Sequence, residues 1–176
     1  HRAQSPWRGW SCAVVPVDGG AFYHFGTSRE LVETTVRLQN ADLDQRHFGR
    51  AGRQHPAAFI QNAEVGVGLH DSNHSIWVEN AVIPPSWSLA HSHILTGIPA
   101  NGWGLRLPAG VCLDLVPAGE AEWAVRFYGM DDTFRGALGE VGTRWLGQPV
   151  ETWFRERGLT LTGCGLEADT DLQRAA

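Results

Sequence analysis

The clearest hydrophobic pattern in the chain is a loose six-residue repeat over residues 77–100, WVENAVIPPSWSLAHSHILTGIPA. Apolar residues open successive units of this repeat, at Trp77, Ile83, Leu89 and Leu95. In a hexapeptide β-helix each unit forms one short strand and a corner, and the leading apolar side chain fills the interior. We therefore expect these four side chains to point inward.

The repeat has an echo upstream. FIQNAEV (59–65) and WVENAVI (77–83) share an aromatic residue, an aliphatic residue and an Asn-Ala pair, which places Asn62 and Asn80 18 residues apart. Three six-residue units make one coil of a parallel β-helix, so this separation is one coil. The pattern predicts two or three parallel coils, and a β-meander with irregular turns is the alternative.

Prolines in the repeat fit the coil. Proline cannot donate to a strand ladder, but it is tolerated at a corner between strands. The sequence therefore places corners at or near Pro84, Pro85, Ala90 and Thr96.

The residues before the repeat predict a hairpin and a helix. CAVVPV and AFYHF, within residues 11–25, surround an Asp-Gly-Gly turn and are rich in β-branched and aromatic residues, which is typical of a β-hairpin. In GTSRELVETTVRLQN, Thr27 or Ser28 can cap a helix, and Glu30 can close a capping box with Thr27. The polar, Arg-rich residues 41–56 predict a surface connector.

After residue 100 the repeat gives way to alternation, which predicts three consecutive strands within residues 104–110, 111–119 and 122–129. The segment GMDDTFRGAL offers an Asp cap for a short helical turn. QPVETWFRERG predicts a better helix, with Pro149 near its first position and Gly158 beyond its end.

Together these elements predict a mainly β fold: a short parallel β-helix of hexapeptide-like coils, a flanking N-terminal hairpin-plus-helix, and a short C-terminal helix. We assign residues 1–56 to the hairpin, helix and connector that pack on the coil, residues 57–165 to the β-helix-like domain with its C-terminal helix, and residues 166–176 to the start of a linker. A coil this short has open ends, so it implies neighbours that cap them.

Composition excludes several classes of protein. The net charge is −5 and all 14 basic residues are Arg, so the chain has no basic footprint for nucleic acid and no lysine for a P-loop or Schiff base. No apolar run approaches the roughly 20 residues of a membrane helix.

Three cysteines without metal-like spacing favour a reducing, cytoplasmic environment. The start of the sequence has neither an initiator Met nor a signal-peptide pattern, so we expect a piece of a longer protein.

Several long stretches resemble a known family: AFYHFGTSREL, the run from SIWVENAV to CLDLVP, and RFYGMDDTFRGAL followed by WLGQPVETW. They are similar to the fucose salvage family of fucose-1-phosphate guanylyltransferases and bifunctional L-fucokinase/GDP-L-fucose pyrophosphorylases, over roughly residues 11–160. The resemblance implies the β-helical, non-nucleotide-binding portion of a GDP-L-fucose-forming enzyme. Its implied role is structural, with oligomer contacts and a contribution to the fucose-1-phosphate site.

The resemblance also implies neighbours in the same chain: a nucleotide-binding domain upstream and, in bifunctional members, a GHMP-type kinase domain downstream. GTP and Mg²⁺ belong to the parent enzyme. The sequence has neither a Gly-rich phosphate-cradling loop of the nucleotidyltransferase type nor a kinase signature, so we expect no cofactor, no catalytic residue and no catalysis in this segment alone. The alternative is a stand-alone carbohydrate-binding or scaffold module, which the eight Trp residues would suit.

Four residues are candidates for sugar-phosphate binding. His24, Thr27 and Ser28 lie at the junction of a predicted strand and helix, where free N–H groups of the helix N-terminus can bind a phosphate. A plainly capped helix is the alternative at this position. Arg126 lies on a predicted strand near Trp123 and Tyr128, and it is a candidate anion contact or a member of a surface ion pair.

Four histidines are candidate metal ligands. His91 and His93 alternate on one predicted strand and should share a face, with His70 and His74 on the preceding loop. No third ligand has convincing spacing, so we predict no metal site.

Two further groups have open alternatives. Asp131 and Asp132 are either Mg²⁺ ligands or a helix cap with a first-turn acid. Trp77, Trp87 and Trp103 either stack on sugar faces or belong to a core or a buried interface.

Overall fold

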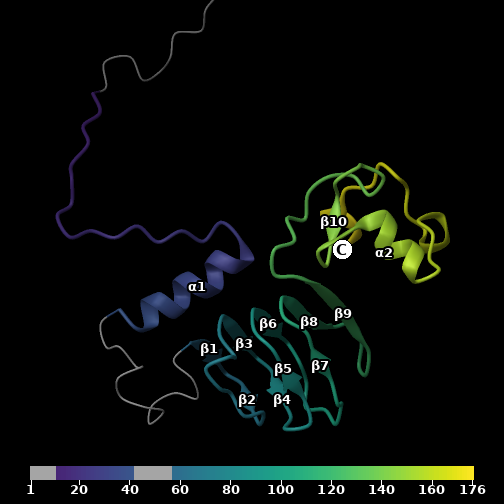
Figure 1. The fold of residues 1–176 in the computed structure, drawn as a ribbon, viewed down its shortest axis with the longest axis horizontal. Coiled ribbons are helices and arrows are strands. Elements are labelled where there is room, and N and C mark those ends of the chain that lie inside the picture. The colour runs from purple at the N-terminus through teal and green to yellow at the C-terminus, as the bar shows by residue number, and fades with distance from the viewer. Residues whose placement is uncertain (1–10, 42–56) are drawn as a thin grey trace, which may run out of the picture.

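The computed structural model describes residues 11–41 and 57–176, and it confirms a mainly β fold built on a parallel β-solenoid of about three turns (Figure 1). Helix α1 (Ser28–Gln39) lies along the solenoid, and a small C-terminal lobe follows it. The predicted connector falls almost wholly on residues 42–56, which lie outside the described residues.

The solenoid strands form three parallel sheets, as the coil interpretation predicted. The largest contains β1 (Ala58–Gln61), β3 (Ile76–Glu79), β6 (His93–Thr96) and β8 (Val111–Pro117). The other two pair β2 (Glu64–Val65) with β4 (Val82–Ile83), and β5 (Ser88–Leu89) with β7 (Arg106–Leu107). Parallel pairing throughout these coils excludes the β-meander. The third coil also continues beyond residue 100, where the sequence repeat had ended.

The register explains which side chains fill the interior. Ile83 and Leu95 are buried in the core, and the half-buried Leu89 packs against it, as predicted. The prediction for Trp77 is wrong. One coil joins Ala58 to Ile76 over 18 residues, but the next joins Ile76 to His93 over 17, so Leu95 pairs with Val78 rather than Trp77. Trp77 therefore points outward.

The solenoid interior is apolar and contiguous. Burying a side chain of this size fully contributes roughly 1.5–3 kcal/mol, so this stack is the main source of the domain's stability. Its fully or nearly fully buried members are Ala58, Leu69, Ile76, Val78, Ala81, Ile83, Trp87, Leu95, Ile98, Leu113 and Leu115.

One corner of the solenoid explains the Asn-Ala echo. Asn62, Asn80 and Gly97 stack on successive coils with φ of 46°, 49° and 66°, a left-handed conformation that Asn and Gly adopt most readily. The side-chain amide of Asn62 donates to Oδ1 of Asn80 over 2.6 Å. The repeated asparagines therefore serve the backbone of the corner.

A second corner repeats the same conformation with different residues. Ser75, Ser92 and Gly110 have φ of 55°, 60° and 80° on successive coils. The predicted proline corner is also present, because Pro84 and Pro85 follow β4 and the N–H of Trp87 closes a turn onto the Pro84 carbonyl over 3.1 Å.

Helix α1 covers the outer face of the main sheet. The Thr27 hydroxyl accepts from the N–H of Glu30, which confirms the predicted cap. Val32 is buried against Ile94, Cys112 and Met130, with Trp77, Val36 and Tyr128 packed around them. Burial raises the pKa of the Cys112 thiol to about 12, so this cysteine is an unreactive member of the apolar cluster beneath α1.

The predicted N-terminal hairpin is absent. Residues 11–25 contain a turn in which the N–H of Gly20 donates to the Val17 carbonyl over 3.1 Å, but no strand. An isolated two-stranded hairpin is marginal in water, and residues 11–25 pair with none of the described sheets.

The C-terminal lobe follows β9 (Trp123–Gly129), which pairs antiparallel with β8. Its elements are β10 (Arg144–Trp145), β11 (Gln148–Pro149), α2 (Val150–Glu156), a 3-10 turn (Thr162–Cys164) and α3 (Leu172–Ala175). They enclose a cluster of Leu138, Trp145, Val150 and Leu172.

Two expectations for this lobe are wrong and one is confirmed. Helix α2 is present, with Pro149 at its start and Gly158 beyond its end at φ 64°. The helical turn after Asp131 and Asp132 is absent, because the Asp132 carboxylate instead accepts from the N–H groups of Gly129 and Leu146 and holds a loop. Residues 166–176 are not the start of a linker, since Leu172 is buried in the lobe.

The corner conformation makes a testable prediction at Gly97. A Cβ there would overlap the Leu115 carbonyl of the next coil, and φ would remain left-handed, so Gly97→Ala should lower the free energy of unfolding by about 3–5 kcal/mol. Gly110→Ala is the matched control: it has the same sign of φ but open space around the new methyl, so we expect a loss of about 1–2 kcal/mol. Urea unfolding of both variants measures the difference, and equal losses would contradict the stacked corner.

Candidate functional site

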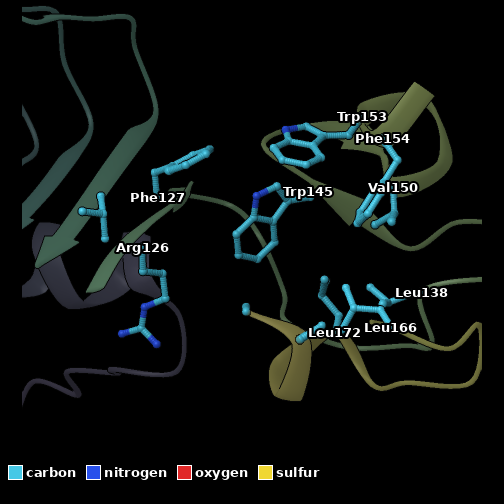
Figure 2. A pocket seen from close by; sticks show the side chains of 12 residues that line it. Arg126, Phe127, Leu138, Trp145, Val150, Trp153, Phe154, Leu166 and Leu172 are labelled. Atoms are coloured by element: carbon cyan, nitrogen blue, oxygen red, sulfur yellow. The ribbon is translucent and has the colours of Figure 1, made fainter. Parts of the chain in front are cut away.

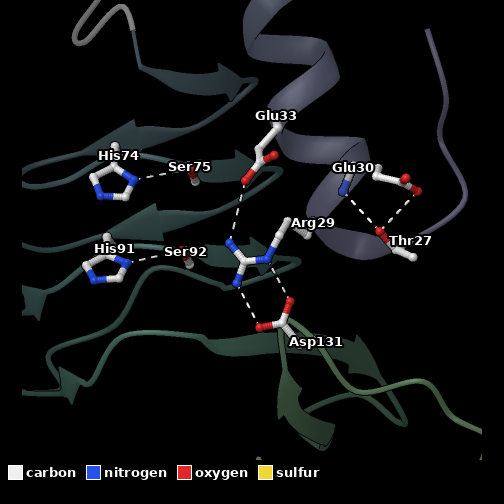
Figure 3. Close-up of polar contacts among 9 residues, drawn as sticks. All are labelled: Thr27, Arg29, Glu30, Glu33, His74, Ser75, His91, Ser92 and Asp131. Atoms are coloured by element: carbon white, nitrogen blue, oxygen red, sulfur yellow. Dashed lines mark hydrogen bonds and ion pairs between the residues drawn. The ribbon is translucent and has the colours of Figure 1, made fainter.

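Three of the predicted sugar-phosphate residues meet at the N-terminus of α1, but an internal carboxylate already binds there (Figure 3). Oε2 of Glu30 accepts from the N–H of Gly26 at 3.1 Å and the hydroxyl of Thr27 at 3.2 Å, and it lies 3.0 Å from Nδ1 of His24. The hydrogen bond with His24, followed by the one from Thr27, holds the pKa of Glu30 below its ordinary value. Ser28 is the first residue of the helix.

The same end of α1 is tied to the loop that follows β9. Nε and Nη2 of Arg29 donate to the two carboxylate oxygens of Asp131 over 2.7 and 2.8 Å, and Glu33 lies 3.5 Å from the same guanidinium (Figure 3). The hydrogen bonds from Arg29 lower the pKa of Asp131. Asp131 is therefore neither a helix cap nor a free metal ligand, and it fixes the helix end to the loop.

A hollow of about 370 Å³ opens beside this ion pair, lined by residues 26–29 and 130–135. Thr27 and Ser28 line the hollow, and His24 lies two residues before its first lining residue, Gly26. Arg126 is absent from its lining. The structure therefore does not bring all four predicted residues into one site.

Arg126 belongs to a polar row on the outer face of the main sheet. Its Nη2 donates to Oδ2 of Asp114 over 2.7 Å, and Oδ1 of the same carboxylate accepts from the Thr96 hydroxyl over 2.6 Å. The guanidinium carbon also lies 6.0 Å from the centre of the Tyr128 ring. The charge of Arg126 is thus balanced within the fold, in the surface ion pair that was the alternative to an anion contact.

The histidines do not share a face. Ser92 between them is in the left-handed region, so His91 lies outside the solenoid, where its ring stacks on His74 with centroids 4.7 Å apart. His93 is fully buried, and its Nδ1 lies 2.7 Å from the Val111 carbonyl. Each outer imidazole bonds instead to the next serine, Ser75 or Ser92 (Figure 3). No cluster of three or more metal-ligating side chains occurs among residues 11–41 and 57–176.

The three tryptophans divide between core and surface. Trp77 lies beneath α1 with its ring 4.2 Å from that of Phe59, and Trp87 is buried in the solenoid interior. Trp103 is 43% exposed and stacks on Trp87 with centroids 6.4 Å apart. Of the three, Trp103 presents the most open aromatic surface.

An apolar groove that sequence reasoning missed lies between β9 and the C-terminal lobe (Figure 2). It holds about 190 Å³ and is lined by Val125 and Phe127 of β9 and by Trp145, Trp153 and Leu172 of the lobe. The rings of Phe127 and Trp153 lie 6.3 Å apart across it. The groove joins segments far apart in sequence, so only the alternation of apolar residues in β9 could have hinted at it.

The β9 side of the groove belongs to a longer row of apolar side chains. In the β8–β9 register, Phe127 and Val125 pair with Leu113 and Leu115, which are buried in the interior, and Trp123 follows in the same phase. These β9 side chains are nevertheless 41–56% exposed. β9 therefore carries an interior-type apolar face that no further coil covers within residues 11–41 and 57–176.

These observations define the chemistry that the described surface offers. The Glu30 and Asp131 carboxylates and the Arg29 and Arg126 guanidinium groups all have internal partners. The exposed apolar and aromatic area instead suits contact with another protein surface. No helix in residues 11–41 or 57–176 has the length and apolar character needed to cross a membrane.

Fold and site together define a short β-solenoid module with a helix seated on its main sheet and an uncovered apolar end. The chain is 44% identical over 164 residues, 93% of its length, to the L-fucokinase/L-fucose-1-P guanylyltransferase of Bacteroides fragilis. The family resemblance seen in the sequence is thereby confirmed for this segment. The chain spans only 17% of that enzyme's length. No protein-family model matches the chain, and no solved structure matches it.

The buried His93 generates a prediction about pH. Burial lowers its pKa, so the imidazole is neutral in the folded state, with Nδ1 donating to the Val111 carbonyl. In the unfolded chain this histidine takes up a proton near pH 6.5. Its contribution to the free energy of unfolding is therefore complete above about pH 6.5 and is lost as the pH falls toward its folded pKa. The His93→Gln variant has no such loss. The difference in free energy of unfolding between the native protein and this variant should therefore become smaller from pH 7.5 to pH 5. Urea unfolding at each pH tests this, with the exposed His70→Gln as control; a gap that stays constant would refute it.

Proposed function

We propose that this chain is the β-solenoid portion of a GDP-L-fucose-forming enzyme, with a structural and oligomerisation role. The observation that carries the proposal is the 44% identity with the Bacteroides enzyme over nearly the whole chain. The geometry supports it, because the parallel coils stack around one contiguous apolar interior, and the charges of Arg29 and Arg126 are balanced within the fold.

The proposal assigns the nucleotide chemistry to other parts of a cytoplasmic parent polypeptide. GTP and Mg²⁺ would bind in a domain upstream, and a bifunctional parent would also carry a GHMP-type kinase domain downstream. The uncovered face of β9, with Trp123, Val125 and Phe127, is suited to pack against such a neighbour or a second copy.

The proposed contribution to the fucose-1-phosphate site is a hydrogen-bonding wall at the N-terminus of α1. Glu30 already takes the hydrogen bonds of Gly26 and Thr27 there, so the helix end is a poor clamp for a phosphate. His24, whose side chain is 60% exposed, and Ser28 are available to hydroxyl groups of a sugar beside the hollow. Arg126 would act separately, through its ion pair with Asp114.

The function itself is tested with the parent polypeptide. We expect it to convert GTP and L-fucose-1-phosphate to GDP-L-fucose and pyrophosphate, and we expect no turnover by residues 1–176 alone. Chromatographic detection of GDP-L-fucose measures both. A parent that forms no GDP-L-fucose, combined with binding of free glycans by the 176-residue chain in calorimetry, would favour the stand-alone carbohydrate-binding module instead.

The proposed wall is tested by His24→Ala in the parent. Loss of one hydrogen bond costs about 1 kcal/mol, so the KM for L-fucose-1-phosphate should rise about fivefold while kcat and the KM for GTP stay unchanged. His70→Ala, which removes an exposed histidine from the solenoid, is the matched control. An unchanged KM in His24→Ala would remove this end of α1 from the sugar-phosphate site.

A further inference from the structure

Residues 11–25 combine strong β-strand preference with nearly complete exposure. Val14 and Phe22 are 95% and 86% exposed, and Val15 and Val17 are only slightly less so. Asp18 is the one acidic or basic residue, histidine aside, in the segment. An exposed stretch with strong β-strand preference and little charge marks a contact site for another sheet or protein surface.

The segment leaves the solenoid from a fixed point. The Thr34 hydroxyl donates to the His24 carbonyl over 3.0 Å, and the guanidinium of Arg37 lies over the ring of Tyr23. Arg29 and Asp131 in turn hold this end of α1 against the loop after β9. Residues 23 and 24 therefore belong to the solenoid surface, whereas residues 12–22 project away from it (Figure 1).

The segment is not placed to pair with the chain's own sheet. The main sheet ends at β1 and β9, and neither edge strand is paired with residues 11–25. Residues 12–26 would span roughly 50 Å when extended, which exceeds the length of β9. The segment is therefore long enough to pair with β9. In the structure the segment instead extends along the outer side of α1 and beyond it (Figure 1).

Pro16 defines how residues 12–17 can pair. Successive N–H groups of a strand point to opposite edges, so Ala13, Val15 and Val17 donate on one side while Pro16 removes a donor from the other. A strand of this kind pairs along one edge only. Residues 12–17 therefore suit the outermost position of a sheet.

We propose that residues 12–17 add as an edge strand to a β-sheet in the part of the parent polypeptide that precedes this chain, so that α1 anchors the solenoid to that domain. The inference rests on the proposed function for the existence of the preceding domain. Its partner is defined by chemistry: a free sheet edge with an apolar face. The Bacteroides relative, of which this chain spans 17%, is long enough to contain such a domain as well.

Hydrogen–deuterium exchange tests the proposal on the parent polypeptide and on the 176-residue chain. The amides of residues 13, 15 and 17 should exchange freely in the 176-residue chain at every concentration, and at least 100-fold more slowly in the parent. Val15→Asp should abolish this protection in the parent and leave the unfolding midpoint of the 176-residue chain unchanged. Val141→Asp, at a valine that is fully exposed in the C-terminal lobe, is the matched control and should preserve the protection.

Three outcomes would overturn the proposal. Free exchange in the parent would show that the segment has no partner sheet. Protection in the 176-residue chain that rises with concentration would assign the segment to a second copy, and protection independent of concentration would assign it to the chain's own β9 edge. A parent that protects these amides but forms no GDP-L-fucose would refute the proposed function and leave the interdomain strand standing.

Discussion

The parallel stacking of successive coils is the constraint on which the rest of this structure depends. Each coil must return the backbone to the same place above the previous one, so its corners must accept a left-handed residue. Asn62, Asn80 and Gly97 meet that requirement at one corner. The apolar interior forms only because this register places Ile76, Val78 and Leu95 inside.

One coil is a residue shorter than the coil before it, and this changes which side chains face outward beneath α1. Because β3 and β6 are 17 rather than 18 residues apart, Trp77 lies opposite Ile94 and outside the solenoid. There its ring contacts Phe59, and it joins Ile94 and Cys112 in the apolar cluster against which Val32 of α1 packs. The position of α1 in turn fixes where residues 11–25 leave the domain.

The sequence predicted features that depend on local chemistry and coil length. The parallel coils, the capped helix at Thr27 and helix α2 all follow from spacing and propensity. The failures share a different cause. Trp77 was misplaced by a coil-length irregularity, His91 and His93 were separated by a left-handed serine, and the hairpin of residues 11–25 lacked a sheet to support it. The apolar groove at Phe127 and Trp153 was missed because it depends on tertiary contact between distant segments.

The charged groups beside α1 and on the outer face of the main sheet have partners within the fold. Phosphoryl and nucleotidyl transfer require donors that are preorganised toward the reacting oxygens and left open for them. Here Arg29 is bound in a bidentate pair by Asp131, Arg126 is bound by Asp114, and the helix N-terminus is bound by Glu30. These polar groups thus hold elements of the fold in place, while apolar side chains at β9 and in residues 11–25 remain exposed. The exposed apolar side chains are therefore the part of the described surface best suited to contact another protein surface.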